Sequence, residues 1–375
     1  MAKVDFHDKP FDAGTKLKLD IFRGYIREWL PVFLSRMTCP IVGIYDFFAG
    51  PGRDSEQSPG SPLIIHDEVS EYLPGGQRTI APGISVKLFF NDYDRGNYEQ
   101  LQQEIALWSP QIRNMVSQDN LDFQDAFDLK IGEIQNTHSA NLVIMDQFGI
   151  SSVNQEVFLQ LVDCPKTDIM FFISSAIVGR FSKVESITSR FPIDITPTDN
   201  PKVIHRKVAD YYRKSIPANK EYYVAPFSIK KNNGNIYGVI FGSSNLRGLE
   251  KFLTVCWKLD NFAGEANFSI EDNTSLWEGQ ASLFDEDNIP KKIDRFNNEL
   301  KSYLKERRRD NRELYRFCLE QGFLPKHIKE ILSKLRNDGD LIVVDSTEKP
   351  IGHNYITWKE YNTYKPRAFF IYRGE

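Results

Sequence analysis

Short apolar runs alternate with segments of helical periodicity along the first two thirds of this chain, and this alternation limits its fold more than any other feature. Runs such as IVGIYDFF, SVKLFFND, ANLVIMD and TDIMFFISSA are separated by segments such as SPLIIHDEVSEYL and NYEQLQQEIALW. Strands that alternate with helices predict an α/β fold with a parallel sheet covered on both faces. Such sheets bind ligands beyond the carboxyl ends of their strands, so the residues directly after each run are candidate site residues.

Two further features complete this predicted sheet domain. Leu17, Ile21, Tyr25, Trp29 and Phe33 are spaced four residues apart, which predicts an amphipathic helix before the first strand. The segments KEYYVAPFSIKK and NIYGVIFGSS, joined by a Gly-Asn-rich turn, predict two antiparallel strands that close the sheet.

A glycine-rich turn follows the first predicted strand. The strand ends at Asp46 and continues as Phe-Phe-Ala-Gly-Pro-Gly over residues 47–52. Gly50 and Gly52 allow the backbone to turn tightly and to approach a ligand without a clash at Cβ. No Gly-Lys-Ser/Thr follows and the spacing is not GxGxxG, which argues against a nucleoside triphosphate or a dinucleotide.

Aspartates are also expected where later strands end. Asp92 could accept hydrogen bonds from both hydroxyls of a ribose, and Asp125 in FQDAF could receive an adenine amino group. A carboxylate that can bind a ribose, in a sequence without a phosphate-binding loop, predicts a ligand that contains a nucleoside. Any one aspartate could instead be a turn or cap residue, but their placement at successive strand ends favours a binding role.

These residues resemble the motifs of class I S-adenosylmethionine (SAM) methyltransferases. Residues 46–52 resemble the first motif, and Asp92, Asp125 and Asp146 fall at the places of the second, third and fourth. The blocks KLKLDIFRGYIREWLPVFL, DFFAGPGR, GSPL, FFNDYD, VIMDQFG, YGVIFGSSNLRGLEKFL and WKLDNFAGEANF, within residues 16–284, resemble the three-Cys-motif partner protein (TcmP) family. GSPL also resembles a signature of bacterial adenine-N6 methyltransferases that act on 23S ribosomal RNA.

The resemblance implies a Rossmann-like methyltransferase domain that binds SAM as its cofactor. It also implies which residues bind the cofactor. Asp46 would hold the ammonium, and Gly50 and Gly52 would lie against the methionine part, with Ala49 between Phe48 and Gly50 as a further cofactor-binding residue. Phe48 would pack on the adenine, Asp92 would hold the ribose and Asp125 the adenine amino group.

The segment Asp146-Gln147-Phe148-Gly149 stands where amine methyltransferases usually carry Asp/Asn-Pro-Pro-aromatic. Asp146 and the Gln147 carbonyl could accept hydrogen bonds from a target amine, and Phe148 could stack on a flipped base. Related partner proteins commonly have Asp-Pro-Phe-Gly, and losing the rigid proline leaves the loop less defined. The alternative is that this loop binds SAM without transferring its methyl group, or binds nothing, with Phe148 in the core.

The implied function is methylation of an exocyclic amine, adenine N6-like, in DNA or RNA. The alternative is a catalytically weak or inactive component that acts with a three-cysteine-motif protein in a phage-related or mobile-element system.

The C-terminal part is basic, whereas the rest of the chain is acidic. Residues 290–375 contain 19 Lys and Arg against 13 Asp and Glu, and the rest contains 28 against 38. We therefore expect a methyltransferase-like domain at 1–268, a polar linker at 269–290 and a second domain at 291–375. A basic domain favours nucleic-acid contact, although a solvated charged helix is the alternative.

The second domain resembles a winged helix. Helices are predicted before and after residue 322, the second beginning at Pro325, and the strands DLIVVD and RAFFIYR form the wing. Nucleic-acid contacts are expected from the exposed face of the second helix, at Lys326, Lys329, Lys334 and Arg336. A protein-docking winged helix with a solvated basic face is the alternative.

The N-terminal segment has no apolar region of the signal-peptide type, and the chain has no uncharged apolar run of about 18 residues. We therefore expect a cytoplasmic protein without membrane contact. The four cysteines are far apart and lack CxxC spacing, which argues against a disulfide framework and a structural zinc site.

Overall fold

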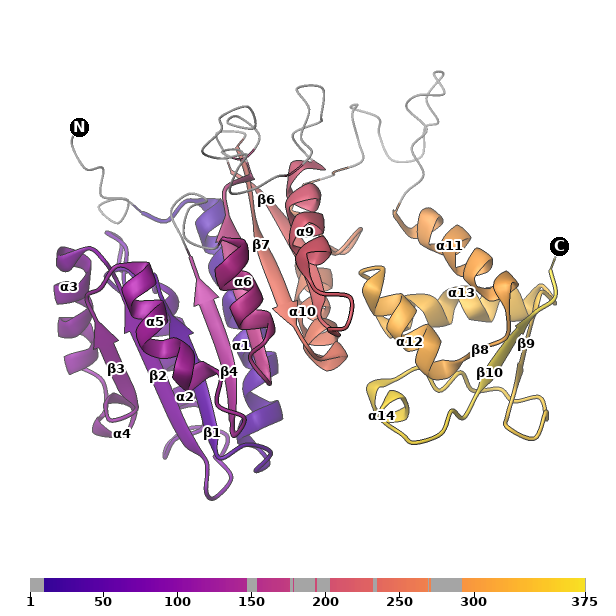
Figure 1. Cartoon of the computed structure of the whole chain (residues 1–375), viewed down its shortest axis with the longest axis horizontal. Helices are drawn as coiled ribbons and strands as arrows, with labels where there is room; N and C mark the ends of the chain where they lie inside the picture. The colour runs from indigo at the N-terminus through magenta and orange to yellow at the C-terminus, as the bar shows by residue number, and fades with distance from the viewer. Residues whose placement is uncertain are drawn as a thin grey trace. The chain divides into compact units, whose positions relative to one another are not determined.

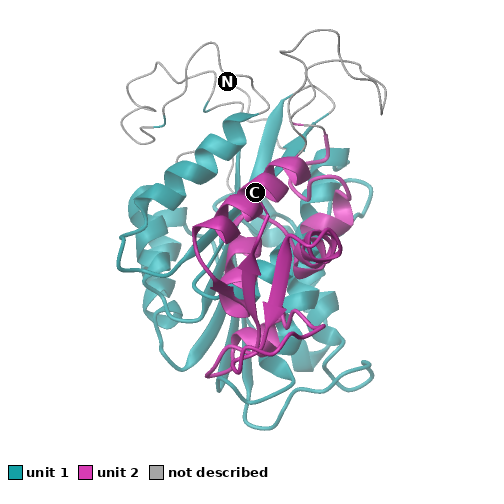
Figure 2. Cartoon of the chain, turned by 90° about the vertical axis from the view of Figure 1, so that its right-hand side faces the viewer, with its two compact units in different colours: residues 1–255 teal, residues 256–375 magenta. Residues whose placement is uncertain are grey.

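The computed structural model describes residues 10–146, 154–175, 178, 193, 203–231, 235–268, 270 and 292–374. The chain divides into two compact units, residues 1–255 and 256–375 (Figure 2). The first unit contains a seven-stranded sheet and the second a three-stranded sheet.

The large sheet has the strand order β3-β2-β1-β4-β5-β7-β6 (Figure 1). Its first five strands are parallel to one another, and β7 runs antiparallel to both β5 and β6. The strands are β1 (Ile41–Asp46), β2 (Ser85–Asn91), β3 (Val116–Asp119), β4 (Ser139–Met145), β5 (Thr167–Ile173), β6 (Tyr223–Lys230) and β7 (Ile236–Ser243). This order, with β7 inserted antiparallel, is that of the class I methyltransferase fold and confirms the predicted fold class.

Helices cover both faces of the large sheet. Tyr25 of α1 and Phe252 of α10 pack on Phe241 of β7, at ring-centroid distances of 4.9 and 4.6 Å. On the other face, Phe158 of α6 packs against Phe171 of β5. The helices are α1 (Ala13–Leu34), α2 (Ser61–Ser70), α3 (Arg95–Ala106), α4 (Pro110–Arg113), α5 (Phe123–Ile134), α6 (Gln155–Val162), α9 (Ile204–Ser215) and α10 (Leu246–Leu259).

The helix α1 is the one predicted before the first strand. Asp12 caps its N-terminus, because its carboxylate accepts a hydrogen bond from the Thr15 N–H at 2.7 Å. The stripe predicted from the four-residue spacing is buried at Ile21, Tyr25 and Trp29. Burial of one face of a 22-residue helix fixes α1 against the sheet.

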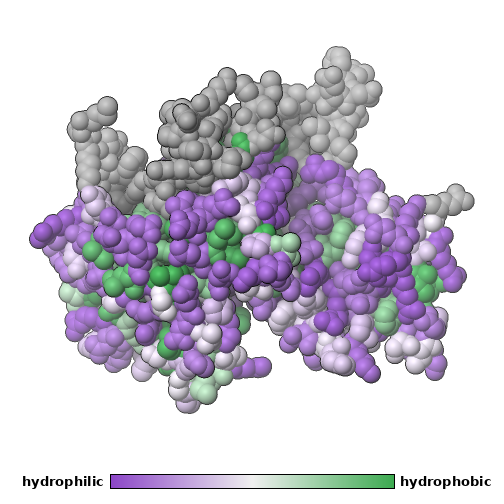
Figure 3. All heavy atoms as spheres, in the orientation of Figure 1, coloured by the Kyte–Doolittle hydropathy of each residue, from purple (hydrophilic) through white to green (hydrophobic). Residues whose placement is uncertain are grey.

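The second unit has the three-helix and β-wing arrangement of a winged helix-turn-helix domain. Its small sheet is antiparallel, in the order β8-β10-β9, and Gly339, at φ +84°, turns the chain from α13 into β9. The face of this unit seen in Figure 3 is mainly hydrophilic. The elements are α11 (Lys292–Glu306), β8 (Arg309–Asp310), α12 (Asn311–Glu320), α13 (Pro325–Asn337), β9 (Leu341–Val344), α14 (Trp358–Tyr361) and β10 (Phe369–Tyr372).

Within the described ranges, no helix is both long enough and apolar enough to span a bilayer. The four cysteines are free and buried. The segment predicted as a linker, 269–290, lies outside the described residues except for Ile270.

Candidate cofactor and transfer site

Three aspartates meet at the carboxyl edge of the large sheet. Asp46 ends β1, Asp92 follows β2 and Asp146 follows β4. Because β1 pairs with both β2 and β4, these side chains are brought to one edge, and both neighbours act electrostatically on Asp46. Among the described residues, no group of three or more His, Cys, Asp or Glu has the arrangement of a metal site.

The turn after β1 is built on two glycines in left-handed conformations. Gly50 has φ +65° and Gly52 has φ +90°, a region that residues with a Cβ rarely adopt. A Cβ on Gly52 would lie 3.0 Å from Leu63 Cδ1 and 3.3 Å from Leu101 Cδ1. The Gly60 N–H donates to the Gly52 carbonyl at 2.7 Å. Since Gly60 is the N-cap of α2, the turn lies at the N-terminus of that helix.

Asp46 is fully buried and only partly hydrogen-bonded. Its Oδ1 accepts the Phe48 N–H at 3.2 Å, whereas its Oδ2 is buried and has no hydrogen-bond partner among the described residues. Burial raises the pKa of Asp46 to about 7. The nearby Ser61 side chain and the Phe48 N–H favour the ionised carboxylate and partly offset this rise. A buried acceptor without a donor costs about 1–3 kcal/mol. Asp46 is therefore suited to a ligand that brings a cationic hydrogen-bond donor.

Asp92 faces the glycine turn, and its oxygens are occupied by protein donors. Oδ2 accepts the Gly50 N–H at 2.8 Å. Oδ1 accepts the Asp94 N–H at 2.8 Å and the Asn97 side-chain amide at 3.3 Å. A ribose bound here would share these oxygens, so Asp92 also shapes the turn, a role that the sequence did not indicate.

Ala49 and Phe48 take fixed positions in the same turn. The Ala49 N–H donates to the Asn91 carbonyl at 2.9 Å, which ties the turn to the end of β2. Phe48 is half-buried and stacks on Phe123 of α5, with a centroid distance of 5.3 Å and an interplanar angle of 14°. The half-buried ring of Phe48 thus lies at the carboxyl edge, where it was predicted to contact an adenine.

Asp125 does not lie at a strand end, which corrects the sequence interpretation. It is exposed in the first turn of α5, and its N–H is capped by the Asp122 carboxylate at 3.0 Å. The strand that the interpretation missed is β3, which ends at Asp119 opposite Asn91. This edge strand is only four residues long and three of them are polar, so it contains no apolar run that would predict a strand. Asp119 is half-buried at the carboxyl edge and was not among the predicted site residues.

Asp146 forms an ion pair with Lys18 of α1, a residue that the sequence interpretation missed. Lys18 Nζ contacts Asp146 Oδ2, and the two side chains are 8% and 22% exposed. The Lys18 ammonium also lies 5.0 Å from the centroid of the Phe172 ring. The sequence did contain one sign that Lys18 is buried: it lies in helical phase with Ile21 and Tyr25. The predicted catalytic residues Gln147 and Phe148 lie outside the described residues.

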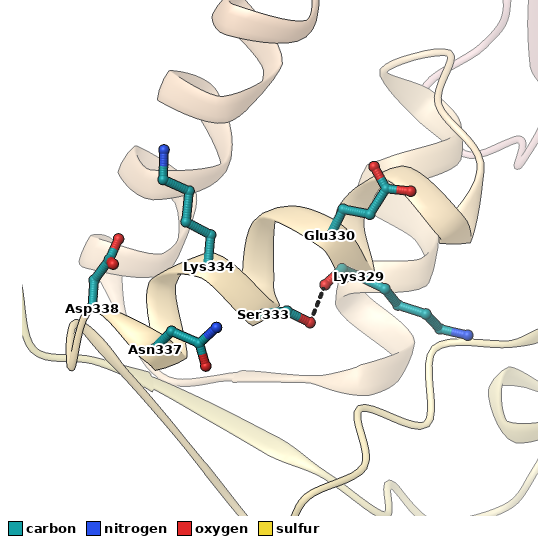
Figure 4. Close-up of a pocket in the computed structure, with 6 residues that line it drawn as sticks. All are labelled: Lys329, Glu330, Ser333, Lys334, Asn337 and Asp338. Carbon is teal, nitrogen blue, oxygen red and sulfur yellow. Dashed lines mark hydrogen bonds between the residues drawn. The ribbon is translucent and has the colours of Figure 1, made fainter.

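The basic face predicted on α13 forms only in part. Lys326 and Lys334 are exposed and Lys329 is half-buried. In Figure 4, Lys329 and Lys334 extend in opposite directions from a shallow pocket, which is also lined by Glu330, Ser333, Asn337 and Asp338. Arg336 donates to the backbone carbonyls of Ile351 at 3.0 Å and Gly352 at 2.8 Å, so it braces the loop after β9 and is not a free cation.

The basic run before α12 is also engaged in intramolecular contacts. Each of its three arginines pairs with a carboxylate: Arg307 with Glu313, Arg308 with Glu348, and Arg309 with Glu306.

Comparison with known proteins gives one family match and several distant structural matches. Residues 268–348 match the family model described as "GMT-like wHTH domain", where wHTH denotes a winged helix-turn-helix. This match confirms the winged-helix prediction. No curated protein sequence matches the chain.

The similar solved structures include proteins in complex with SAM, one of which is described as an O-methyltransferase. Trm1 from Pyrococcus horikoshii with S-adenosyl-L-methionine is 9% identical, with a TM-score of 0.37; the match covers 63% of this chain and 58% of Trm1. TYW2 from M. jannaschii with AdoMet is 14% identical, with coverages of 64% and 79% and a TM-score of 0.30. The O-methyltransferase TomG from Streptomyces achromogenes with SAM is 10% identical, with coverages of 62% and 90% and a TM-score of 0.30. These similarities are distant.

Proposed function

We propose that this protein is a SAM-dependent methyltransferase that acts on nucleic acid, at an exocyclic base amine of the adenine N6 type. One observation carries the proposal: Asp46, which directly precedes the turn that contains Gly50 and Gly52, is fully buried, and one of its oxygens has no hydrogen-bond partner in the described part of the chain. This carboxylate lies at the ligand-binding edge of a class I methyltransferase sheet.

The residues at this edge fit the chemical groups of SAM. The unpartnered Asp46 oxygen suits an ammonium group, and the N-terminus of α2, which has no side-chain cap, suits a carboxylate. Phe48 offers a ring face for the adenine, and Asp92 offers acceptors for ribose hydroxyls. SAM, when bound, supplies an electrophilic methyl group.

The transfer step is assigned to the segment after β4. Asp146 would accept a hydrogen bond from the acceptor amine and orient its lone pair, with the Gln147 carbonyl and Phe148 beside it. The exposed part of the Lys18–Asp146 pair is mainly the carboxylate, which leaves Asp146 accessible to an acceptor.

A nucleic-acid acceptor is supported by the second unit. A winged helix-turn-helix domain commonly places one helix in a nucleic-acid groove, and α13 presents Lys326, Lys329 and Lys334. The excess of basic residues in the C-terminal part adds an attraction to phosphate.

A second function is favoured by the sequence at Gln147, where the proline common among related partner proteins is absent. In this alternative, the chain is a member of the TcmP family that binds SAM but transfers its methyl group weakly or not at all. It would serve as a partner of a three-cysteine-motif protein in a phage-related or mobile-element system.

The test is incubation of the purified protein with radiolabelled SAM and, in separate tubes, total RNA, genomic DNA and a three-cysteine-motif protein. The proposal predicts label in the RNA or the DNA tube. Label in the protein tube alone contradicts a nucleic-acid acceptor. SAM binding without any transfer supports the second function.

A further inference from the structure

We propose that Lys18 is a positioning residue of the transfer site, which holds Asp146 from the protein side while the acceptor approaches from the solvent side. The inference rests on the proposed function and extends it to a residue of α1.

The burial of Lys18 requires a specific partner. The residue is 6% exposed, and an ammonium group removed from water without compensation is strongly disfavoured. Its position on the buried stripe of α1 would suit an apolar side chain better. Its compensation comes from the Asp146 carboxylate and the face of the Phe172 ring.

The two members of the pair differ in exposure. Lys18 contacts Oδ2 of Asp146, and the Asp146 side chain is 22% exposed against 8% for Lys18. A ligand entering from solvent therefore meets the carboxylate before it meets the ammonium. Because one oxygen is fixed by Lys18, the carboxylate has a defined orientation in which the other oxygen can accept a hydrogen bond from an amine.

The helix that carries Lys18 is anchored along its length. Near its start, Asp12 pairs with Lys231 at 3.1 Å. Further along, the hydroxyl of Tyr25 donates to buried Asp168 at 2.6 Å, and Arg27 forms two hydrogen bonds to Glu68, at 2.6 and 3.0 Å. A helix fixed at several points can hold a side chain within the narrow tolerance that positioning requires.

Lys18 also offsets the negative charge of the three aspartates at the carboxyl edge of the large sheet. Asp46, Asp92 and Asp146 converge at this edge, and Lys18 contributes a positive charge at the last of them. Without Lys18, Asp146 would be a partly buried carboxylate beside two other acids. It would then be free to rotate toward solvent or toward whatever cation is available.

The experiment compares four full-length proteins: wild type, Lys18→Met, Lys18→Arg and Lys16→Met. Lys16 is exposed on the same helix turn and serves as the matched control. Methyl transfer is measured with radiolabelled SAM and the acceptor that the wild type labels. SAM affinity is measured by calorimetry, and thermal unfolding checks that each variant is folded.

A positioning role predicts that Lys18→Met lowers kcat by about 100-fold, the cost typical of a misplaced reacting group, while SAM affinity changes less than about threefold. Lys18→Arg, which keeps the charge, should recover part of kcat, and Lys16→Met should match the wild type. If Lys18→Met is folded and has the wild-type kcat, the positioning role of Lys18 is wrong, whereas the proposed function stands. A wild type that binds SAM but labels no acceptor overturns the proposed function, and the inference with it.

A second measurement examines the contact itself without relying on activity. Acetylation of lysines by a reactive ester, followed by peptide mass spectrometry, should label Lys18 at least about 10-fold more slowly than Lys16, because Lys18 is buried and paired. Asp146→Asn should raise the labelling rate of Lys18 and leave that of Lys16 unchanged. Equal rates for Lys18 in both proteins contradict the assigned pairing, and methylation of Lys18 after incubation with SAM would identify it as an acceptor instead.

Discussion

At the scale of single residues, Asp46 is a buried carboxylate, and one of its oxygens has no hydrogen-bond partner among the described residues. Asp46 is kept at 0% exposure, although burial raises its pKa to about 7. Such a residue lowers the stability of the free protein, and its retention makes physical sense where a ligand completes its hydrogen bonds.

The first prediction concerns pH and stability. The folded pKa of Asp46, about 7, lies above its unfolded value of 3.8, so its contribution to stability is fully present below about pH 4 and is lost as the pH rises to about 7. Replacing Asp46 with Asn removes the buried charge and should stabilise the SAM-free protein at pH 8 by about 1–3 kcal/mol, with no gain at pH 4. Denaturant unfolding of both proteins at the two pH values measures this. A gain that is larger at pH 4 than at pH 8 would contradict the assignment.

The second prediction separates the transfer residue from the cofactor residues. Asp146→Ala should abolish methyl incorporation and leave SAM affinity nearly intact, because Asp146 is assigned to the acceptor. Asp146→Asn serves as a second variant, because it keeps the side-chain shape and one acceptor oxygen, and thermal unfolding checks that both variants are folded. If both variants lose SAM binding together with transfer, Asp146 belongs to the cofactor pocket.

At the scale of elements, the glycine turn between β1 and α2 is the part of the site that the backbone alone makes possible. Gly50 and Gly52 take φ values that other residues rarely adopt, and Asp92 fixes the turn by accepting the Gly50 N–H. A side chain at Gly52 would meet both strain and crowding from Leu63.

The third prediction tests this turn with a matched control. Gly75 also has positive φ, at +100°, but an added Cβ would meet nothing within 4 Å. Gly75→Ala should therefore cost about 1–2 kcal/mol of backbone strain and leave SAM affinity unchanged. Gly52→Ala should cost more and weaken SAM binding at least about 10-fold. Thermal unfolding and calorimetry provide the comparison, and equal SAM affinity in the two variants would argue against a cofactor at this turn.

The fourth prediction concerns α13. Replacing Lys326, Lys329 and Lys334 with Ala should weaken nucleic-acid binding and reduce the slope of log affinity against log salt by up to about 3, which reflects lost phosphate contacts. Arg336→Ala should instead lower the thermal stability of the second unit, because its two backbone hydrogen bonds are lost, and leave the salt slope unchanged. Fluorescence anisotropy at several salt concentrations measures the slope. An unchanged slope in the triple variant would favour the protein-docking interpretation of this domain.

At the scale of the whole molecule, the sequence predicted the architecture better than it predicted the details of the site. The strands β1, β2, β4 and β5 carry conspicuous apolar runs because they lie inside a sheet covered on both faces. The edge strand β3 has no such run, so Asp125 was assigned to a strand end that Asp119 occupies. A short polar edge strand leaves too little periodicity to be recognised.

One omission, Lys18, and one further misassignment, Arg336, both involve contacts with residues distant in sequence. Lys18 pairs with Asp146, 128 positions along the chain, and its phase with the apolar stripe indicates burial but does not identify this partner. Arg336 was assigned to an exposed face, but the loop at Ile351 and Gly352 supplies carbonyl acceptors that no helical pattern reveals.

We propose that the carboxyl edge of the sheet at the end of β1 binds SAM through the Asp46 carboxylate, and calorimetric titration of SAM between pH 6 and pH 8 is the decisive measurement. We expect the affinity for SAM to rise with pH through about 7, as Asp46 ionises, and we expect Asp46→Asn to weaken binding by about 10- to 100-fold and to flatten this pH dependence. Absence of SAM binding at millimolar concentration, or equal affinity for the wild type and Asp46→Asn at every pH, would contradict it.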